Sequence, residues 1–270
     1  ALGQAQWTDW FLDLQTSGLP QNPTGRITSR AAYGGGPWHL GLDFAKDASW
    51  VHVSNLSFRC QDASLEGALR VHLKTALAAG SLRVAVPRLE VLAPVLHKDL
   101  RGSLEGTLDL GDEDAQQQLL GNLTVRSAAF DGIGVDRLHL SAQFHALSPS
   151  PRGMVTLTVH NLQKPPWTVT TGEAAVEGGR DRLTFSTRVE GMLKHPFSLN
   201  TAGTARLDTD TKELTVTSFD GTTGPVVVAL EGPAHVAIHA RGLETSPIRV
   251  RVGDGRLDGR IQWVGENPFA

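Results

Sequence analysis

Leu65-Glu66-Gly67-Ala68-Leu69-Arg70-Val71 is the stretch of sequence that decides the fold. Its odd positions are apolar or glycine and its even positions are mostly charged or polar, which is the period-two pattern of a strand with one dry face and one wet face. The phrase recurs at 104–110 (LEGTLDL), at 257–263 (LDGRIQW) and more loosely at 189–193 (VEGML). These repeats predict a long series of amphipathic strands in one sheet, whose apolar face holds another molecule.

The composition fits a folded β protein and narrows its partners. The chain has 270 residues, of which 40% are hydrophobic and 20% charged, as in ordinary soluble domains. Its 29 glycines against nine phenylalanines, six tryptophans and one tyrosine indicate many turns and few bulky core residues. A net charge of -3 is too small to indicate a nucleic-acid partner. The single cysteine, Cys60, excludes an internal disulfide.

Alternating segments follow one another along nearly the whole chain and are separated by short turns such as 34–37, 131–132 and 148–151. The alternating phrase at residue 100 begins one expected strand. The other expected strands are 38–46, 50–58, 63–76, 80–87, 117–128, 134–147, 153–161, 166–177, 181–191, 196–207, 212–219, 225–231, 234–241, 247–252 and 256–264. No helical pattern alternates with these segments, so the fold class is an all-β antiparallel meander. Residues 20–270 should form one continuous segment, because no long linker interrupts them.

Two stretches depart from the alternation. Residues 1–19 place four large apolar side chains at i, i+3, i+4 and i+7, namely Trp7, Trp10, Phe11 and Leu14. Gly18 follows them at a position suited to a C-terminal helix cap. They predict a short amphipathic helix that caps the sheet. The stretch 87–96 predicts a short helical turn or plug, interrupted by proline, that presents Leu89, Leu92, Val95 and Leu96.

No constellation of catalytic or metal-binding residues stands out. His235 and His239 share one face of an expected strand but would stand about 13 Å apart, too far to share a metal ion. Cys60 has no neighbouring histidine or basic pocket that would activate it. The sequence also lacks a nucleophile elbow, a P-loop, an HExxH motif and a dinucleotide fingerprint. We therefore expect a protein that is not an enzyme and that uses neither a metal nor a cofactor.

The stretch from Phe58 to Leu162 resembles the TamB family of AsmA-like, bridge-like lipid-transfer proteins. The resemblance rests on 65–77, on GSLRVAV at 80–86, LEVLAPVL at 89–96, LRGSLEGTLDL at 100–110, GNLTV at 121–125 and GIGVDRLHLSA at 132–142. The style of 7–37 and 254–264 also fits, so the resemblance covers most of the chain. It is a resemblance of pattern, which implies a fold and a role and names no site residue.

The resemblance implies a long curled β-sheet, shaped like a taco or half-pipe, with an apolar concave face. It further implies a middle segment of a longer protein that is anchored in the inner membrane of a Gram-negative bacterium and lacks here its anchor and its barrel-docking part. Such a protein spans the periplasm, lies beside an outer-membrane Omp85-type barrel and conducts phospholipids between the inner and outer membranes.

The expected partners in the groove are phospholipid acyl chains. The residues predicted to line it are Leu69, Val71, Leu73, Val84, Val86, Leu108, Leu110, Leu138, Leu140, Phe144, Leu157 and Val159. Two alternatives stay open. The same alternation fits a closed β-sandwich, in which these side chains fill a core. A structural or chaperone-like scaffold for the assembly of outer-membrane barrel proteins would use the sheet edges instead.

Overall fold

A computed structural model describes residues 7–18, 21–33, 36–93, 98–113, 115–147, 150–207, 211–239 and 242–264 of the chain. The chain divides into two compact units, Ala1–Ser148 and Pro149–Ala270. Each unit consists almost entirely of antiparallel β-strands. The predicted all-β class is therefore confirmed.

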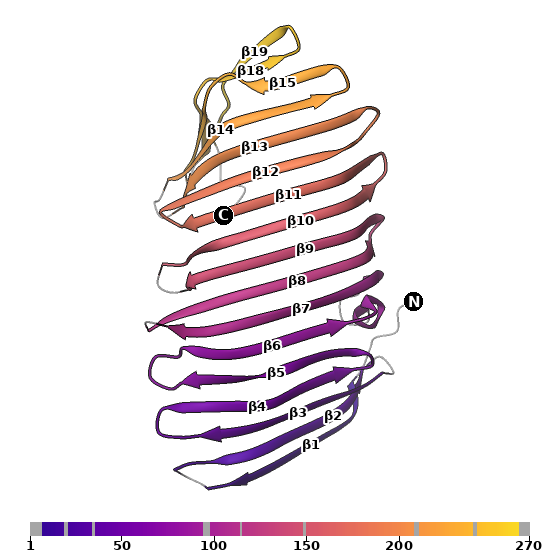
Figure 1. Cartoon of the computed structure of the whole chain (residues 1–270), viewed down its shortest axis with the longest axis vertical. Helices are drawn as coiled ribbons and strands as arrows, with labels where there is room; N and C mark the ends of the chain where they lie inside the picture. Colours follow the sequence, from indigo (N-terminus) through magenta and orange to yellow (C-terminus); the bar gives the residue numbers. More distant parts are fainter. Residues whose placement is uncertain are drawn as a thin grey trace. The chain divides into compact units, whose positions relative to one another are not determined.

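The first unit is a meander in which each strand pairs antiparallel with the next along the chain (Figure 1). Its strands are β1 (Trp7–Ser17), β2 (Thr24–Tyr33), β3 (Gly36–Lys46), β4 (Trp50–Cys60), β5 (Ala63–His72), β6 (Ala78–Val86), β7 (Leu100–Glu113), β8 (Gln116–Phe130) and β9 (Ile133–Ala146). The first and last of these strands do not pair with each other. The sheet of this unit is therefore open.

The second unit begins as the same kind of meander and then forks. Its strands are β10 (Arg152–Lys164), β11 (Trp167–Gly179), β12 (Arg182–Met192), β13 (Pro196–Arg206), β14 (Lys212–Thr223), β15 (Val226–Leu230), β16 (Ala234–His239), β17 (Gly242–Thr245), β18 (Ile248–Val252), β19 (Gly255–Gly259) and β20 (Gln262–Val264). One end of β14 pairs with β15 and the other with β16. One branch continues through β18 and β19, and the other through β17 and β20.

The predicted helix over residues 1–19 is wrong, because the described part of this segment is strand β1. Its alternation of Trp10, Leu12 and Leu14 pairs in register with β2, where Leu12 lies opposite Ser29 and Leu14 opposite Ile27. A bulge at Asp9, whose φ is 54°, shifts the register ahead of this run. The bulge places the apolar residues at spacings that also fit a helix, so the helical period was coincidental.

The predicted helical turn in 87–96 is confirmed as a short 3-10 helix, η1, which spans Leu89–Leu92. Its other two predicted residues, Val95 and Leu96, lie outside the described residues. The expected strand 256–264 is wrong as one element, because β19 ends at Gly259 and β20 begins only at Gln262. Each of these short strands pairs with a different branch of the fork.

Candidate functional site

The cross-strand register gathers the apolar side chains of β5–β9 on one face. Leu69 lies opposite Gly80, which in turn lies opposite Leu110, and Leu110 lies opposite Leu119 of β8. Leu119 then faces Phe144 of β9. Directly opposed residues point to the same side of a sheet, so these positions and those two residues away form a continuous surface, here called the apolar face.

Most of the residues predicted to line a groove lie on this apolar face. Those in the first unit that do so are Leu69, Val71, Val84, Val86, Leu108, Leu110, Leu138, Leu140 and Phe144. Leu73 does not belong to the strand expected there, because β5 ends at His72; its side chain lies in the following turn and is 46% exposed. Leu157 and Val159 lie in β10 of the second unit, opposite Ala174 and Gly172.

The apolar face contains a hollow of about 330 Å³ over β5–β9. Two glycines make room for it: Gly106 lies between Val84 and Leu123, and Gly121 lies opposite Leu108. The prediction missed several side chains that line the hollow, namely Leu65, Leu82, Leu119 and Leu123. The sequence contains a signal for these leucines, because each occupies an alternate position of its strand, as the predicted groove-lining residues do.

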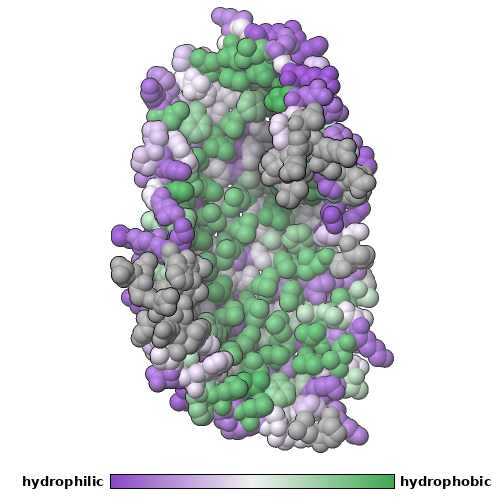
Figure 2. All heavy atoms as spheres, turned by 180° about the vertical axis from the view of Figure 1, so that it is seen from behind, coloured by the Kyte–Doolittle hydropathy of each residue, from purple (hydrophilic) through white to green (hydrophobic). Residues whose placement is uncertain are grey.

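This face is only partly covered. Figure 2 shows a hollowed surface of hydrophobic residues, with hydrophilic side chains gathered along its margins. Among the described residues, the buried hydrophobic ones are Ala31, Ala63, Val86, Leu89, Val91 and Ala234, and no large side chain is fully buried. The leucines of the hollow are half-buried, whereas the inward side chains of a closed sandwich would be enclosed between two sheets. The sandwich alternative is therefore not supported.

The accessible surface of the chain leads to the same conclusion. The chain exposes 17,180 Å², whereas a compact monomer of 28.9 kDa exposes about 11,400 Å². Two separate compact domains of half that mass would together expose about 13,700 Å². The excess is thus independent of how the two units are arranged, and it indicates sheets whose faces are not enclosed.

The 3-10 helix η1 covers one end of the apolar face. Leu89 and Val91 are buried there together with Ala63 and Val86, at the start of β5 and the end of β6. Next to η1, the Arg88 guanidinium lies 2.6 Å from the Asp62 carboxylate in the β4–β5 turn. This contact is exposed and contributes little stability, so apolar burial holds the helix in place. The hollow lies beside this covered region and shares Val84 with it.

The opposite, wet face carries ion pairs between neighbouring strands. Arg26 of β2 lies 2.6 Å from Asp43 of β3, which it directly opposes. Hydrogen bonds from Arg26 and Asn55 lower the pKa of the Asp43 carboxyl to about 2. Further pairs between neighbouring strands are Arg59–Glu66, Arg126–Glu105, Arg206–Glu213 and Arg249–Asp258. These pairs favour one register over others, because a slip of one residue would move the charges onto the apolar side.

In the second unit, phenylalanine rings lie over glycines on the corresponding face. Phe185 opposes Gly203 and Phe197 opposes Gly191. Each ring lies so close to its glycine that a Cβ atom at the glycine would overlap the ring. This arrangement covers a strand glycine with an aromatic ring from its neighbour. Hydroxyls also enter the face, because Thr187 opposes Thr201 between these pairs. The face of this unit is therefore less purely aliphatic than the face of β5–β9.

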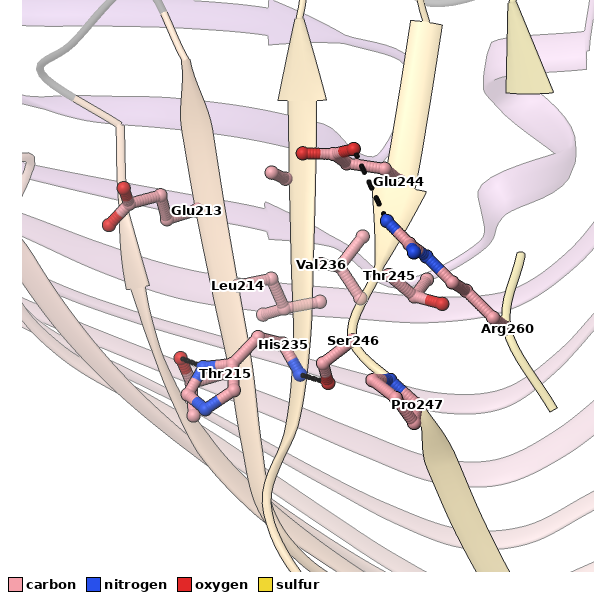
Figure 3. Close-up of a pocket in the computed structure, with 11 residues that line it drawn as sticks. Glu213, Leu214, Thr215, His235, Val236, Glu244, Thr245, Ser246, Pro247 and Arg260 are labelled. Carbon is pink, nitrogen blue, oxygen red and sulfur yellow. Dashed lines mark hydrogen bonds and ion pairs between the residues drawn. The ribbon is translucent and has the colours of Figure 1, made fainter. Parts of the chain in front are cut away.

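A second hollow, of about 460 Å³, lies where the sheet forks (Figure 3). Its polar groups bind one another: the Glu244 carboxylate lies 3.8 Å from Arg260, and the Thr215 hydroxyl lies 2.9 Å from Nδ1 of His235. The backbone N–H of His235 donates to the Ser246 hydroxyl at 3.0 Å. No cluster of three or more potential metal ligands occurs among the described residues. We infer a structural role for these contacts, which join β14, β16 and β17.

The fold and this site define a class of protein: an all-β chain of open antiparallel sheet with one exposed apolar face. Comparison with models of protein families, with curated proteins and with solved structures finds no match. In the described part of the chain, no helix is long and apolar enough to cross a membrane.

Proposed function

We propose that the apolar face of β5–β9 binds the acyl chains of phospholipids. In this proposal the chain is a non-catalytic segment of a larger periplasm-spanning protein, which conducts lipids between the inner and outer membranes. The observation that carries the proposal is the aliphatic surface of β5–β9, which is hollowed and only half covered. The resemblance of the chain's sequence pattern to TamB-like proteins supports the same role.

Physical chemistry explains how such a face would work. Each methylene that leaves water gains about 0.8 kcal/mol, so an acyl chain laid on leucine and valine side chains is held without a specific anchor. The hollow is lined by Leu82, Leu108 and Leu140 and offers no charged side chain. A lipid can therefore shift from one position to the next at little cost, while its head group stays in water at the strand ends. Many weak positions suit transport better than one tight site.

The test is to measure phospholipid on the purified chain by native mass spectrometry after incubation with vesicles of phosphatidylethanolamine and phosphatidylglycerol. Leu140→Asp places a charge in the hollow and should reduce bound lipid at least tenfold. Ser141→Asp is the matched control, because Ser141 is the next residue along β9, on the wet face opposite Asn122. Leu108→Asp and Thr107→Asp form a second matched pair on β7.

Bound lipid on the wild type and on both wet-face variants, with loss in both apolar-face variants, would support the proposal. Equal lipid on all five proteins, or no lipid on the wild type, would refute it. Absence of lipid from the wild type would favour the alternative of a structural or chaperone-like scaffold for outer-membrane barrel assembly, which needs no lipid on the sheet.

A further inference from the structure

The connection that carries η1 differs from the other connections of the first unit. The strands there are joined by short turns, whereas β6 ends at Val86 and β7 begins only at Leu100, which makes this the longest connection between strands of the unit. Within it, η1 lies against the apolar face and buries Leu89 and Val91 there. A turn that only reversed the chain would need no such contact.

η1 closes one end of the apolar face (coiled ribbon in Figure 1). Leu89 and Val91 are buried against the start of β5 and the end of β6, and partly buried side chains of β7 and β8 pack against the same cluster. Glu90, the charged residue between them, is exposed. An acyl chain that lies along these strands therefore meets aliphatic side chains at η1 and cannot continue past it.

The opposite end of the apolar face is polar. On β7 and β8 the last opposed pair of aliphatic side chains is followed, two residues further along, by Asp112 opposite Gln117. The Gln117 side chain accepts a hydrogen bond from the N–H of Ala78 at 2.7 Å and donates one to its carbonyl at 2.8 Å. The Asp112 carboxylate lies 3.2 Å from the Arg70 guanidinium. The face is thus closed and aliphatic at one end and polar at the other, as a lipid molecule is.

The aliphatic part between these two ends matches the length of a membrane acyl chain. Along β7 it extends from Leu104, which packs against the cluster around η1, to Leu110. This distance is about 20 Å in an extended strand. The hydrocarbon of one bilayer leaflet is about 15 Å thick, and its chains reach further when they are straightened. A chain of ordinary membrane length therefore fits between η1 and the polar end, and a much longer chain does not.

We propose that η1 is a stop that fixes the orientation and the length of the bound acyl chain. The methyl end lies beside η1 near Val84, which borders both the hollow and the η1 cluster, and the head group lies at the end marked by Gln117. The inference rests on the proposed function and adds chain-length selection to it. Each methylene that finds no apolar contact forfeits about four-fold in affinity.

The first test locates the two ends of the ligand on the unaltered protein. The chain is incubated with palmitate that carries a diazirine at its methyl end and is then irradiated, and the crosslinked residues are identified by mass spectrometry. Crosslinks should fall within 84–92. A palmitate with the diazirine next to its carboxylate should instead label 110–113 and 116–119. The reversed pattern, or one pattern for both probes, would overturn the proposal.

The second test measures chain-length selection. Wild type and a double variant, Leu89→Ala with Val91→Ala, are loaded from phosphatidylcholine vesicles that contain equal amounts of palmitate and the longer behenate. Native mass spectrometry gives the ratio of the two fatty acids on the protein. The wild type should bind behenate at least tenfold less than palmitate, and the double variant should raise that ratio at least tenfold. Glu90→Ala is the matched control on η1 and should keep the wild-type ratio.

The outcomes separate this inference from the proposed function. Palmitate on both proteins, with the same ratio to behenate, would overturn the stop alone and leave lipid binding standing. A wild type that binds neither fatty acid would overturn both. Palmitate on the double variant also shows that this variant is folded; if it binds nothing, the crosslinks on the wild type decide.

Discussion

Filling the hollow from its floor should stabilise the sheet and yet weaken lipid binding. Gly121 lies at the centre of β8 with ordinary backbone angles. A Cβ atom there would lie 3.7 Å from Leu108 Cδ1 and from Leu119 Cδ2, which is normal van der Waals distance. A Cβ atom therefore fits at residue 121, and the two further methyls of Gly121→Val would enter the hollow that this glycine lines. We expect the variant to raise the free energy of unfolding by about 1 kcal/mol, because valine favours strands and glycine does not.

The same side chain takes up space that we assign to an acyl chain. If it displaces two to three methylenes of the ligand, at about 0.8 kcal/mol each, binding weakens by about 2 kcal/mol, or roughly 30-fold in Kd. Urea unfolding gives the stability, and titration with a fluorescent fatty acid, such as cis-parinaric acid, gives the affinity. A stabilised variant that binds the probe as tightly as the wild type would refute the assignment of this hollow to lipid.

Gly106→Ala is the control for Gly121→Val, because it also adds a side chain to the hollow but does not fit. Its Cβ would lie 2.7 Å from the backbone oxygen of Asn122 and 3.0 Å from Leu123 Cδ1. We expect this variant to lose stability as well as affinity. The pair thus separates an effect on the ligand from an effect on the fold, since only Gly121→Val should move the two quantities in opposite directions.

Two further predictions concern stability. Gly203→Ala should destabilise the second unit by about 1–3 kcal/mol in urea unfolding, because the new methyl overlaps both the backbone oxygen of Thr215 and the Phe185 ring. Gly259→Ala, with open space around it, should change little, and equal effects of the two substitutions would contradict this account of the steric overlap. For Asp43, the folded pKa of about 2 lies below the ordinary 3.8, so its ion pair with Arg26 stabilises the fold above pH 3.8 and this contribution disappears as the pH falls toward 2. The urea midpoint of the wild type should exceed that of Asp43→Asn at neutral pH and converge with it across that window; a constant difference down to pH 2 would contradict the assignment.

The sequence alone predicts most of this fold because the period of two is strong and local. Strands β8 and β10, for example, begin within one residue of the expected 117 and 153. The errors occur where local pattern is ambiguous. In β1 the bulge at Asp9 created a helical spacing, and at the C-terminal end one repeat of the phrase bridges two strands that pair with different neighbours.

The site was harder to predict than the strands. Alternation identifies which residues share a face, so the sequence alone places Leu108 and Leu140 on the same face. It does not say whether a second layer covers that face, because an open sheet and a sandwich need the same pattern. The hollow depends in addition on which residues oppose the glycines. That register is set by turns and by bulges such as the one at Ser127, where φ is 49°.

The meander of β1–β9 has a consequence for how such a sheet can change in length. Each strand pairs only with its neighbours along the chain, so few contacts join distant parts of the sequence, as in repeat proteins. Inserting or deleting one hairpin restores the direction of the following strand and keeps its apolar side chains on the same face. Evolution can therefore lengthen or shorten this kind of sheet two strands at a time, without redesigning the strands already present.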